Sequence, residues 1–528
     1  MRYLLHDVFL KSAKDLSESV AIHQENYGDI TYNQLHLLAN QYAHFFKSRK
    51  SSITSQPFVG ILSPVHHQSI AAVLGTLFIG ATYVPLDEYS PDDRLGLILD
   101  NTQLETLVID SHWLSQHQEL LQHPNLKTII VMDEHFIPQN DHTFSLQTIV
   151  NAPTDELPML NQVCDDLAYI LHSSGSTGVP KGIMLSHRNA RTFVDWMQTE
   201  FKLTSEDVVM SRAPFKFDLS VFDIFNTFNA GAKLVCFDWS SERESEQKHS
   251  DYVKLMADQK ASIIYTTPST FIVMMNRGNL AGAGVPLREV MYAGEPFPVP
   301  QLMKLIEALP NTRIANIYGP TETNIITYWW VDDLTAEDAD VPLGYVVEDT
   351  DIMVVAEDGS HICQPDELGE LWCRGGTVTL GYLGMEEKTK ECLVRSPFHK
   401  YPAYYWRTGD FGYRDAENLL HYRGRKDHMV KVKGFRIEIG EIEAALAKHE
   451  ALDEFCVVAV PDEKYGNRLY CYYSVLAEKH ADEEDLRAFL STKLPDYMVP
   501  YSFTQKAVMP KTSSGKVDRV LLATEHKG

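Results

Sequence analysis

Two separated segments of the chain carry residue types suited to phosphate chemistry. The first runs from Ser173 to Gly182 and follows the apolar, strand-like run 167–171. Small hydroxyl residues and glycines let backbone N–H groups and hydroxyls surround a phosphate without obstruction by a Cβ atom, and Lys181 adds a positive charge. A nucleotide-binding P-loop is disfavoured, because its spacing Gly-x4-Gly-Lys-Ser/Thr is absent: Gly178 is followed by Val-Pro-Lys-Gly. Ser/Gly loops also serve as linkers, but this loop predicts phosphate binding.

The second segment, 510–519, places Lys516 twelve residues before the last residue of the sequence. Taken alone, a Ser/Gly stretch that ends in a lysine is usually a solvated terminus without function. Its interpretation therefore depends on the loop more than 330 residues upstream.

Composition narrows the class of protein. A chain of 528 residues is too long for one hydrophobic core, so two or more domains are expected. The formal net charge of −25 argues against general affinity for nucleic acid or anionic membranes. Seven scattered cysteines form no CxxC pair and no Cys/His cluster with metal-ligand spacing, which favours reduced structural thiols. With neither a signal-peptide core nor a membrane span predicted, we expect a soluble cytoplasmic protein.

Alternation of short β-rich runs with helical patterns predicts the main fold. Such runs occur at 106–110, 128–132 and 261–265, each flanked by helix-compatible sequence. This order favours α/β layers with largely parallel sheet. The apolar stretch 70–86 contains glycine, threonine and proline, and it predicts a buried helix that runs into a strand.

A domain boundary is predicted near 424–427. Beyond it, an amphipathic helix opens at 437–446, two strand-like runs follow at 454–460 and 469–475, and a polar helix covers about 482–494. We therefore predict a large multilayered α/β N-terminal domain, residues 1–426, and a small α+β C-terminal domain, residues 427–528.

Further motifs occur in order along nearly the whole chain. They are Tyr-Val-Pro-Leu-Asp at 83–87, Phe-Asp-Leu-Ser at 217–220, Asn-Ile-Tyr-Gly-Pro-Thr-Glu-Thr at 316–323, Gly-Glu-Leu at 369–371, Arg-Thr-Gly-Asp at 407–410 and Gly-Arg-Lys-Asp at 424–427. Together with the Ser173–Gly182 loop, this set resembles the adenylate-forming superfamily, which includes acyl-CoA synthetases, luciferases and the adenylation domains of nonribosomal peptide synthesis. The resemblance implies the fold of these enzymes, a mobile C-terminal domain, and activation of a carboxylate by ATP.

The same resemblance implies roles for single residues. Lys516 would be the catalytic lysine that bridges carboxylate and α-phosphate, Glu322 would orient Mg²⁺, and Thr177 would be a further catalytic residue. A carboxylate that attacks a phosphate is repelled by it, so cations and donors are needed where charge develops. Asp410 would accept from both ribose hydroxyls, and Asn316 would read the adenine edge. The implied nucleotide-binding set is Ser173, Ser174, Gly175, Ser176, Thr177, Gly178, Lys181, Asn316, Tyr318, Thr321, Asp410, Tyr422 and Arg425.

Asp427 resembles the family hinge, about which the small domain rotates between adenylation and thiol transfer. The rotation would withdraw Lys516 and bring the loop 432–435 towards a pantetheine arm, where Gly434 allows close approach. No Gly-Gly-x-Ser phosphopantetheine site occurs in the sequence. The expected acyl acceptor is therefore a separate carrier protein, or CoA.

Asp218 separates the subfamilies by substrate. In amino-acid-activating members of the superfamily, the aspartate at this position pairs with the substrate ammonium. The alternative interpretation is that Asp218 only caps the helix that starts at Leu219. A buried carboxylate is costly without a cationic partner. The other predicted pocket residues are apolar except one threonine, and they are Leu219, Phe222, Thr266, Met291, Ala293, Gly294, Ile317, Ile325 and Ile326.

This lining predicts a small apolar amino acid such as proline, alanine or valine. L-Proline is favoured because bulky Ile, Met and Phe side chains suit a five-membered ring. The sequence thus resembles stand-alone amino-acid:carrier-protein ligases of the prolyl or D-alanyl kind, with ATP and Mg²⁺ as cofactors. Two alternatives remain: an acyl-CoA synthetase for a small carboxylic acid without an ammonium, and a non-catalytic adenylate-binding protein, against which the presence of Lys516, Glu322 and Asp410 argues.

Overall fold

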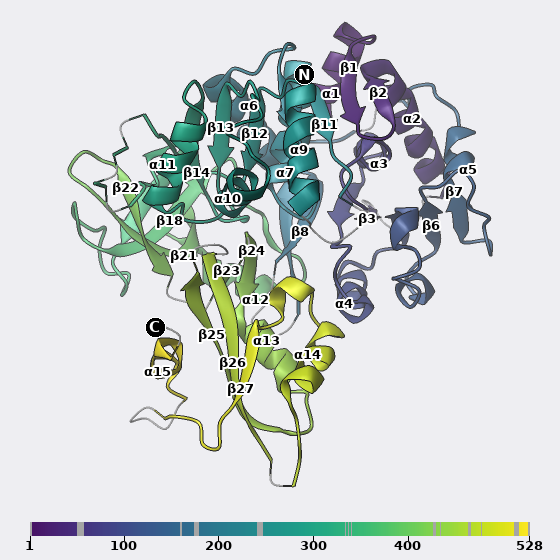
Figure 1. Cartoon of the computed structure of the whole chain (residues 1–528). Coiled ribbons are helices and arrows are strands. Elements are labelled where there is room, and N and C mark those ends of the chain that lie inside the picture. The colour runs from purple at the N-terminus through teal and green to yellow at the C-terminus, as the bar shows by residue number, and fades with distance from the viewer. Residues whose placement is uncertain are drawn as a thin grey trace.

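The computed structural model has a large lobe and a small lobe (Figure 1). It describes residues 3–49, 57–158, 161–173, 179–239, 246–332, 334–335, 337–338, 340–425, 429–432, 434–462, 466–476, 478–511 and 517–525. The predicted fold class, a large α/β N-terminal part followed by a smaller α+β part, is confirmed. Lys426 and the predicted hinge residue Asp427 lie outside the described residues, so the exact boundary stays a prediction.

The first sheet of the large lobe has nine strands among the described residues and is parallel through its centre, from β1 to β14. In sheet order these strands are β16 (Tyr345–Val346), β15 (Thr327–Trp330), β14 (Arg313–Tyr318), β13 (Glu289–Tyr292), β12 (Ile263–Thr266), β10 (Val208–Met210), β11 (Lys233–Cys236), β1 (Val20–Gln24) and β2 (Gly28–Thr31). The central strands β12 and β13 are buried at every position without alternation, as expected for parallel strands covered on both faces.

The second sheet has eight strands in the described part of the chain, with a parallel core and an antiparallel edge. In sheet order they are β19 (Gly381–Tyr382), β9 (Lys181–Ser186), β8 (Leu167–Ser173), β4 (Thr82–Pro85), β3 (Phe58–Leu62), β5 (Thr106–Ile109), β6 (Thr128–Val131) and β7 (Thr143–Ser145). Strands predicted at 106–110, 128–132 and 261–265 are confirmed as β5, β6 and β12. Strand β8 leads directly into the predicted phosphate loop.

Helices pack on these sheets in three hydrophobic clusters: one is shared by both sheets, one joins α9, α10 and α11 to the first sheet, and one joins α4 to the second sheet. They are α1 (Asp7–Asp15), α2 (Tyr32–Arg49), α3 (His67–Phe78), α4 (Asp92–Thr102), α5 (Leu146–Val150), α6 (His187–Phe201), α7 (Leu219–Val221), the π-helix η3 (Phe222–Asn226), α8 (Thr227–Ala230), α9 (Glu246–Asp258), α10 (Pro268–Arg277), α11 (Val299–Ala308) and α12 (Glu386–Cys392), with short 3₁₀ turns η1 (Ser111–Trp113) and η2 (Leu120–Gln122). The stretch 70–86 forms α3 and β4, as predicted. Among the described residues, no helix is both long and apolar enough to cross a membrane.

A third, antiparallel sheet completes the large lobe. Its strands are β17 (Thr350–Val355), β18 (Gly369–Gly375), β21 (Tyr404–Arg414), β20 (Leu393–Arg395) and β22 (Leu420–Arg425). The register of β21 against β22 places Asp410 opposite Arg425. This pairing brings two predicted nucleotide-binding residues together through backbone geometry alone.

The small lobe begins with the hairpin of β23 (Met429–Val432) and β24 (Phe435–Glu438), which points up into the large lobe (Figure 1). Behind it, β25 (Leu452–Asp462), β26 (Gly466–Val475) and β27 (Ser502–Gln505) form a sheet, with α13 (Ile439–Leu446), α14 (Glu483–Ser491), η4 (Asp496–Met498) and α15 (Arg519–Thr524) around it.

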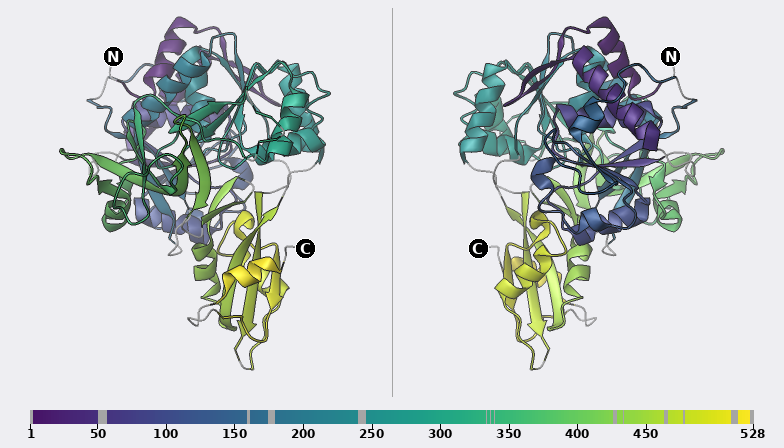
Figure 2. Two further views of the ribbon diagram at one scale, coloured as in Figure 1. Left: turned by 90° about the vertical axis from the view of Figure 1, so that its left-hand side faces the viewer. Right: turned by 90° about the vertical axis from the view of Figure 1, so that its right-hand side faces the viewer.

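Alternating side chains of β25 pack on opposite faces of this sheet, as the period of two requires. Val457 packs with α13 and α14, whereas Cys456 and Val458 pack with Leu522 of α15. Figure 2 shows the two lobes from the sides, with the C-terminal segment on the small lobe. The predicted elements of this lobe are confirmed, with Asp482 as the N-cap of α14.

Candidate active site

The predicted substrate residues gather at the carboxyl ends of parallel strands, where open α/β sheets bind their ligands. Thr266 ends β12, Ala293 and Gly294 follow β13, and Ile317 lies near the end of β14. These three strands are neighbours in the first sheet. Gly294 has φ +92°, a backbone conformation that L side chains rarely adopt.

An apolar group lies beside this edge. Phe222, Met291, Ala293, Ile317 and Ile325 belong to one buried cluster, against which Leu219 packs. Ile326 instead packs with Leu343 and Leu371 in a separate cluster, since adjacent residues of an extended segment point to opposite sides. Its predicted contact with the substrate therefore has no support in this packing.

Asp218 precedes α7, but its side chain does not cap the helix. Burial disfavours the charged form and raises its pKa to about 6, although the Lys431 ammonium and a hydrogen bond with Thr321 act in the opposite direction. The helix that follows contains the π-helical turn η3, a distortion found often at functional sites. Asp218 is thus a half-buried carboxylate whose charge is only partly compensated by the protein.

Lys431 reaches this region from β23 of the small lobe. Burial lowers the pKa of its ammonium, while the carboxylates of Asp410 and Glu295 oppose that shift. The Lys431 ammonium therefore interacts with three carboxylates of the large lobe, those of Asp218, Glu295 and Asp410.

Glu322 lies after β14 and is 1% exposed. The Tyr382 hydroxyl donates to its Oε1 at 2.7 Å, and Arg436 of β24 donates to its Oε2 at 2.6 Å. Burial by itself would raise the pKa of Glu322, but the Arg436 guanidinium and these hydrogen bonds outweigh it and lower the pKa to about 2. The carboxylate is therefore ionised and, in this arrangement of the lobes, paired with a cation from the small lobe.

Asp410 is 5% exposed and holds two predicted nucleotide-binding residues. Tyr318 Oη donates to Asp410 Oδ2 at 2.7 Å, and Arg425 Nη1 donates to Oδ1 at 2.9 Å. The rings of Tyr318 and Tyr422 are 6.5 Å apart. Asn316 is buried nearby on β14 and donates through Nδ2 to the carbonyl of Pro342 at 2.7 Å.

The described part of the predicted phosphate loop comprises its two ends. Ser173 Oγ is buried at the end of β8 without a hydrogen-bond partner among the described residues. Lys181 forms an ion pair with Glu438, which follows Arg436 by two residues in β24. Ser174, Gly175, Ser176, Thr177 and Gly178 lie outside the described residues, as does Lys516.

Contacts between the lobes continue near Ser173, at the end of β8. Asp87 accepts from Lys216 Nζ at 2.5 Å and from the Tyr497 hydroxyl of the small lobe at 3.0 Å. Phe435 stacks on Tyr497 with ring centroids 3.7 Å apart. A cavity of about 70 Å³ is lined by residues of both lobes, among them Asp87, Ser173, Thr321, Phe435, Arg436 and Tyr497.

The β23–β24 turn approaches the large lobe very closely. Gly434 has φ +84°, and a Cβ atom there would lie 3.1 Å from Thr267 Cγ2. The residues that flank Lys516 lie elsewhere: Lys511 pairs with Glu454 on β25, and Val517 packs beside Leu522. Figure 1 shows α15, which begins two residues after Val517, away from the β23–β24 hairpin.

Sequence reasoning missed the residues that the small lobe adds to this site, namely Lys431, Arg436 and Glu438, and also Tyr382 of the large lobe. The three charged residues stand close together in and around the 429–438 hairpin. Their concentration beside Gly434 was an available signal, because glycine at a tight turn often marks a close approach.

The buried carboxylates Asp218, Glu322 and Asp410, together with cations that the small lobe brings to them, are the groups that a nucleotide-dependent ligase needs at its site. Comparison with known proteins agrees. The model of the AMP-binding enzyme family matches residues 9–383, and that of the AMP-binding enzyme C-terminal domain matches residues 441–516. The chain therefore belongs to the AMP-binding enzyme family, whose members are ATP-dependent adenylating ligases.

Individual relatives cover most of the chain. An L-proline--[L-prolyl-carrier protein] ligase of Pseudomonas fluorescens is 34% identical over 463 residues, 87% of each chain. Tyrocidine synthase 3 of Brevibacillus parabrevis is 33% identical over 519 residues, which are 98% of this chain but only 8% of the synthase. The solved structure of IdnL1 superposes with a TM-score of 0.79 at 26% identity, covering 96% of this chain and 99% of IdnL1.

Proposed function

We propose that this protein activates a small apolar amino acid as its aminoacyl-AMP and passes the acyl group to the phosphopantetheine thiol of a separate carrier protein. The observation that carries the proposal is Asp218, a half-buried carboxylate with a raised pKa beside an apolar cluster. Such a group is costly to keep charged unless a cation arrives to pair with it. The ammonium of an amino acid supplies that cation.

L-Proline is the proposed substrate. Phe222, Met291 and Ile325 belong to the apolar cluster against which Leu219, the neighbour of Asp218, packs, so an apolar side chain suits this region better than a charged one. Thr266 adds only a neutral hydroxyl. The name of the Pseudomonas fluorescens relative, at 34% identity over 87% of both chains, favours the same amino acid.

The proposed chemistry has two steps. In the first, a carboxylate oxygen of the amino acid attacks the α-phosphorus of ATP, and the bond from that phosphorus to the oxygen bridging the α- and β-phosphates breaks to release pyrophosphate. In the second, the carrier thiolate attacks the acyl carbon, and AMP leaves. Asp410, held by Tyr318 and Arg425, is the proposed acceptor for the ribose hydroxyls, and Lys181 and Lys516 are the proposed cations for the phosphates.

Glu322 fits the proposed role as a ligand of Mg²⁺. It offers hard carboxylate oxygens and, with a pKa of about 2, stays ionised at neutral pH. Bound Mg²⁺ would neutralise phosphate charge. Arg436 donates to Glu322 Oε2 in this arrangement, so Glu322 would hold the metal only after the β23–β24 hairpin moves away.

The described arrangement of the lobes supports the second step better than the first. Arg436 pairs with Glu322, the proposed Mg²⁺ ligand, and Glu438 pairs with Lys181, a proposed phosphate-binding cation. Gly434 of the same hairpin lies against Thr267. The neighbours of Lys516 lie on the far part of the small lobe. We therefore propose that rotation about the predicted hinge Asp427 exchanges this hairpin for the Lys516 segment during adenylation.

Pyrophosphate exchange tests the function directly. The full chain is incubated with ATP, Mg²⁺, labelled pyrophosphate and a panel of amino acids that includes L-proline, D- and L-alanine, L-valine, L-glutamate and L-lysine. We expect exchange with L-proline or another small apolar amino acid, and none with the charged ones. Exchange with simple acids such as acetate or benzoate, and with no amino acid, would favour the acyl-CoA synthetase alternative; no exchange with any acid would favour a non-catalytic adenylate-binding protein.

A further inference from the structure

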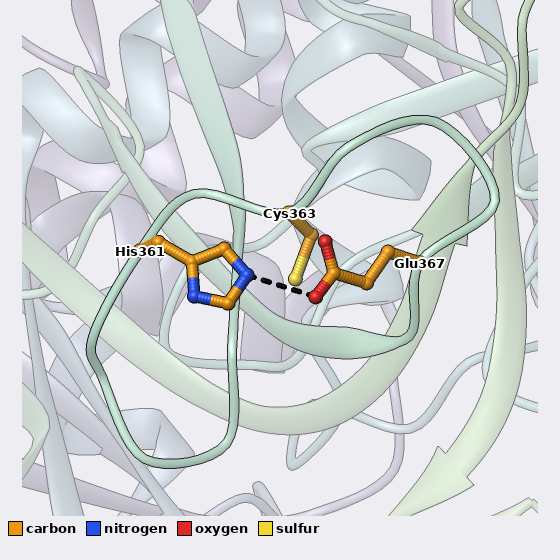
Figure 3. Close-up of side chains that lie close together, drawn as sticks. All are labelled: His361, Cys363 and Glu367. Carbon is orange, nitrogen blue, oxygen red and sulfur yellow. Dashed lines mark hydrogen bonds and ion pairs between the residues drawn. The ribbon is translucent and has the colours of Figure 1, made fainter.

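Three metal-ligating side chains of different types converge on the loop that joins β17 to β18, and none of them belongs to the candidate active site. His361, Cys363 and Glu367 point toward one another there (Figure 3). Their ligand atoms all lie within 4.8 Å of one another, and His361 Nε2 is 2.8 Å from Glu367 Oε1. The sequence spacing did not indicate this cluster, because a turn at 364–367 separates Glu367 from His361 and Cys363 and brings it back toward them.

The backbone of the loop holds these side chains in place. Cys363 N donates to the carbonyl of Val354 at 2.8 Å, and Ile362 pairs with Val355, so this end of the loop extends the β17 ladder. On the other side, Gln364 N donates to Glu367 Oε2 at 2.9 Å. Gly369 leaves space for the thiol, since a Cβ atom there would lie 2.7 Å from Cys363 Sγ.

A neighbouring hydroxyl orients the imidazole. Ser360 Oγ lies 2.9 Å from His361 Nδ1, which leaves Nε2 as the nitrogen that faces Cys363 and Glu367. Hydrogen bonding of the second ring nitrogen is the usual way in which a metal-binding histidine is oriented. The hydroxyl itself is anchored by Asp358, whose Oδ1 lies 2.6 Å from Ser360 Oγ.

We propose that His361, Cys363 and Glu367 form a binding site for one Zn²⁺ ion, with the fourth position open to water. One thiolate, one imidazole and one carboxylate are ligands that zinc accepts together, and their atoms lie roughly 3.3–3.8 Å apart in a tetrahedral site. His361 Nε2 lies 2.8 Å from Glu367 Oε1 and no separation exceeds 4.8 Å, so only small side-chain movements are required. His361 is exposed and the other two are half-buried, so the ion enters from solvent.

Cobalt and zinc titrations of the tag-free, metal-stripped full chain test this site. We expect one equivalent of Co²⁺ to produce a thiolate-to-metal charge-transfer absorption that one equivalent of Zn²⁺ then removes. Cys363→Ser should abolish the absorption, and His361→Gln or Glu367→Gln should weaken Zn²⁺ binding by about tenfold or more. Cys392→Ser is the matched control, since Cys392 is also a half-buried free thiol but lies at the end of α12.

The proposal is overturned if the wild-type chain gives no charge-transfer absorption, or if Cys363→Ser leaves it unchanged. Circular dichroism of each variant shows whether the fold persists, and pyrophosphate exchange should be retained, because the loop shares no residue with the candidate active site. Loss of exchange in the wild-type chain would count against the proposed function, not against the zinc site.

Discussion

The titration of Asp218 links the structure to a pH profile. Asp218 has a pKa of about 6, so protonation in mild acid removes the negative charge that the proposed substrate ammonium would pair with. Lowering the pH through 6 should therefore weaken amino-acid activation. For a group of this pKa, the ionised fraction falls from about 0.9 at pH 7 to about 0.09 at pH 5, so kcat/KM for the amino acid should fall about tenfold.

Asp218→Asn isolates this effect, because the amide keeps the size of the carboxylate and loses its charge. A hydrogen bond to a charged group contributes about 1.5–3 kcal/mol, so the variant should lose about tenfold to a hundredfold in kcat/KM at pH 7.5. The variant should also lose the decline between pH 7 and pH 5. The assay is initial-rate pyrophosphate exchange at subsaturating amino acid and saturating ATP, with Mg²⁺ constant.

Stability at each pH is the necessary control, measured by circular dichroism over the time of the assay. Two results would refute the reasoning. One is an Asp218→Asn variant whose activity declines between pH 7 and pH 5 as steeply as that of the wild type. The other is a variant with unchanged kcat/KM at pH 7.5.

Three further outcomes follow from the same contacts. The pKa of Asp218 in the folded state is about two units above its ordinary value, so ionisation of Asp218 destabilises the fold as the pH rises from about 4 through 6. Asp218→Asn should therefore raise the free energy of unfolding by up to about 3 kcal/mol at pH 7.5 and leave it unchanged below pH 4, which thermal unfolding at both pH values checks. Arg436→Gln leaves the buried Glu322 carboxylate without its cation, which should destabilise this arrangement of the lobes by about 3–5 kcal/mol. Acyl transfer to a carrier thiol should then slow by about tenfold or more while pyrophosphate exchange changes little, and equal losses in both assays would contradict this prediction. Gly434→Ala forces alanine into a positive φ beside Thr267, which costs about 1–2 kcal/mol of backbone strain. Acyl transfer in a carrier-loading assay should slow by about tenfold, and an unchanged rate of pyrophosphate exchange is the internal control.

The elements that pattern reasoning located best are those whose apolar runs are long or strictly periodic. The stretch 70–86 became α3 and β4, and the strands and helices of the small lobe follow their predicted order. Asp482 caps α14 because its side chain accepts from Asp485 N, a contact within four residues that sequence spacing encodes.

The parts of the site contributed by the second lobe were not predictable in this way. Arg436 reaches Glu322 and Glu438 reaches Lys181 only because of how the lobes are placed, and no local pattern determines that placement. Ile326 shows a second kind of failure, because a motif match does not say which side of the chain a residue faces. Ile325 packs in the cluster beside the candidate site, whereas Ile326 packs in a separate cluster. The His361, Cys363 and Glu367 cluster likewise depends on a loop reversal that spacing rules for metal ligands do not describe.

Comparison of L-proline with cyclopentanecarboxylate tests the central claim most directly. Both offer a five-membered ring and a carboxylate, but only proline carries the ammonium that Asp218 is proposed to bind. We predict ATP–pyrophosphate exchange with L-proline, at least tenfold less with cyclopentanecarboxylate, and loss of that preference in Asp218→Ala. Equal exchange with the two acids by the wild-type protein would contradict the assignment of this enzyme as an amino-acid-activating ligase.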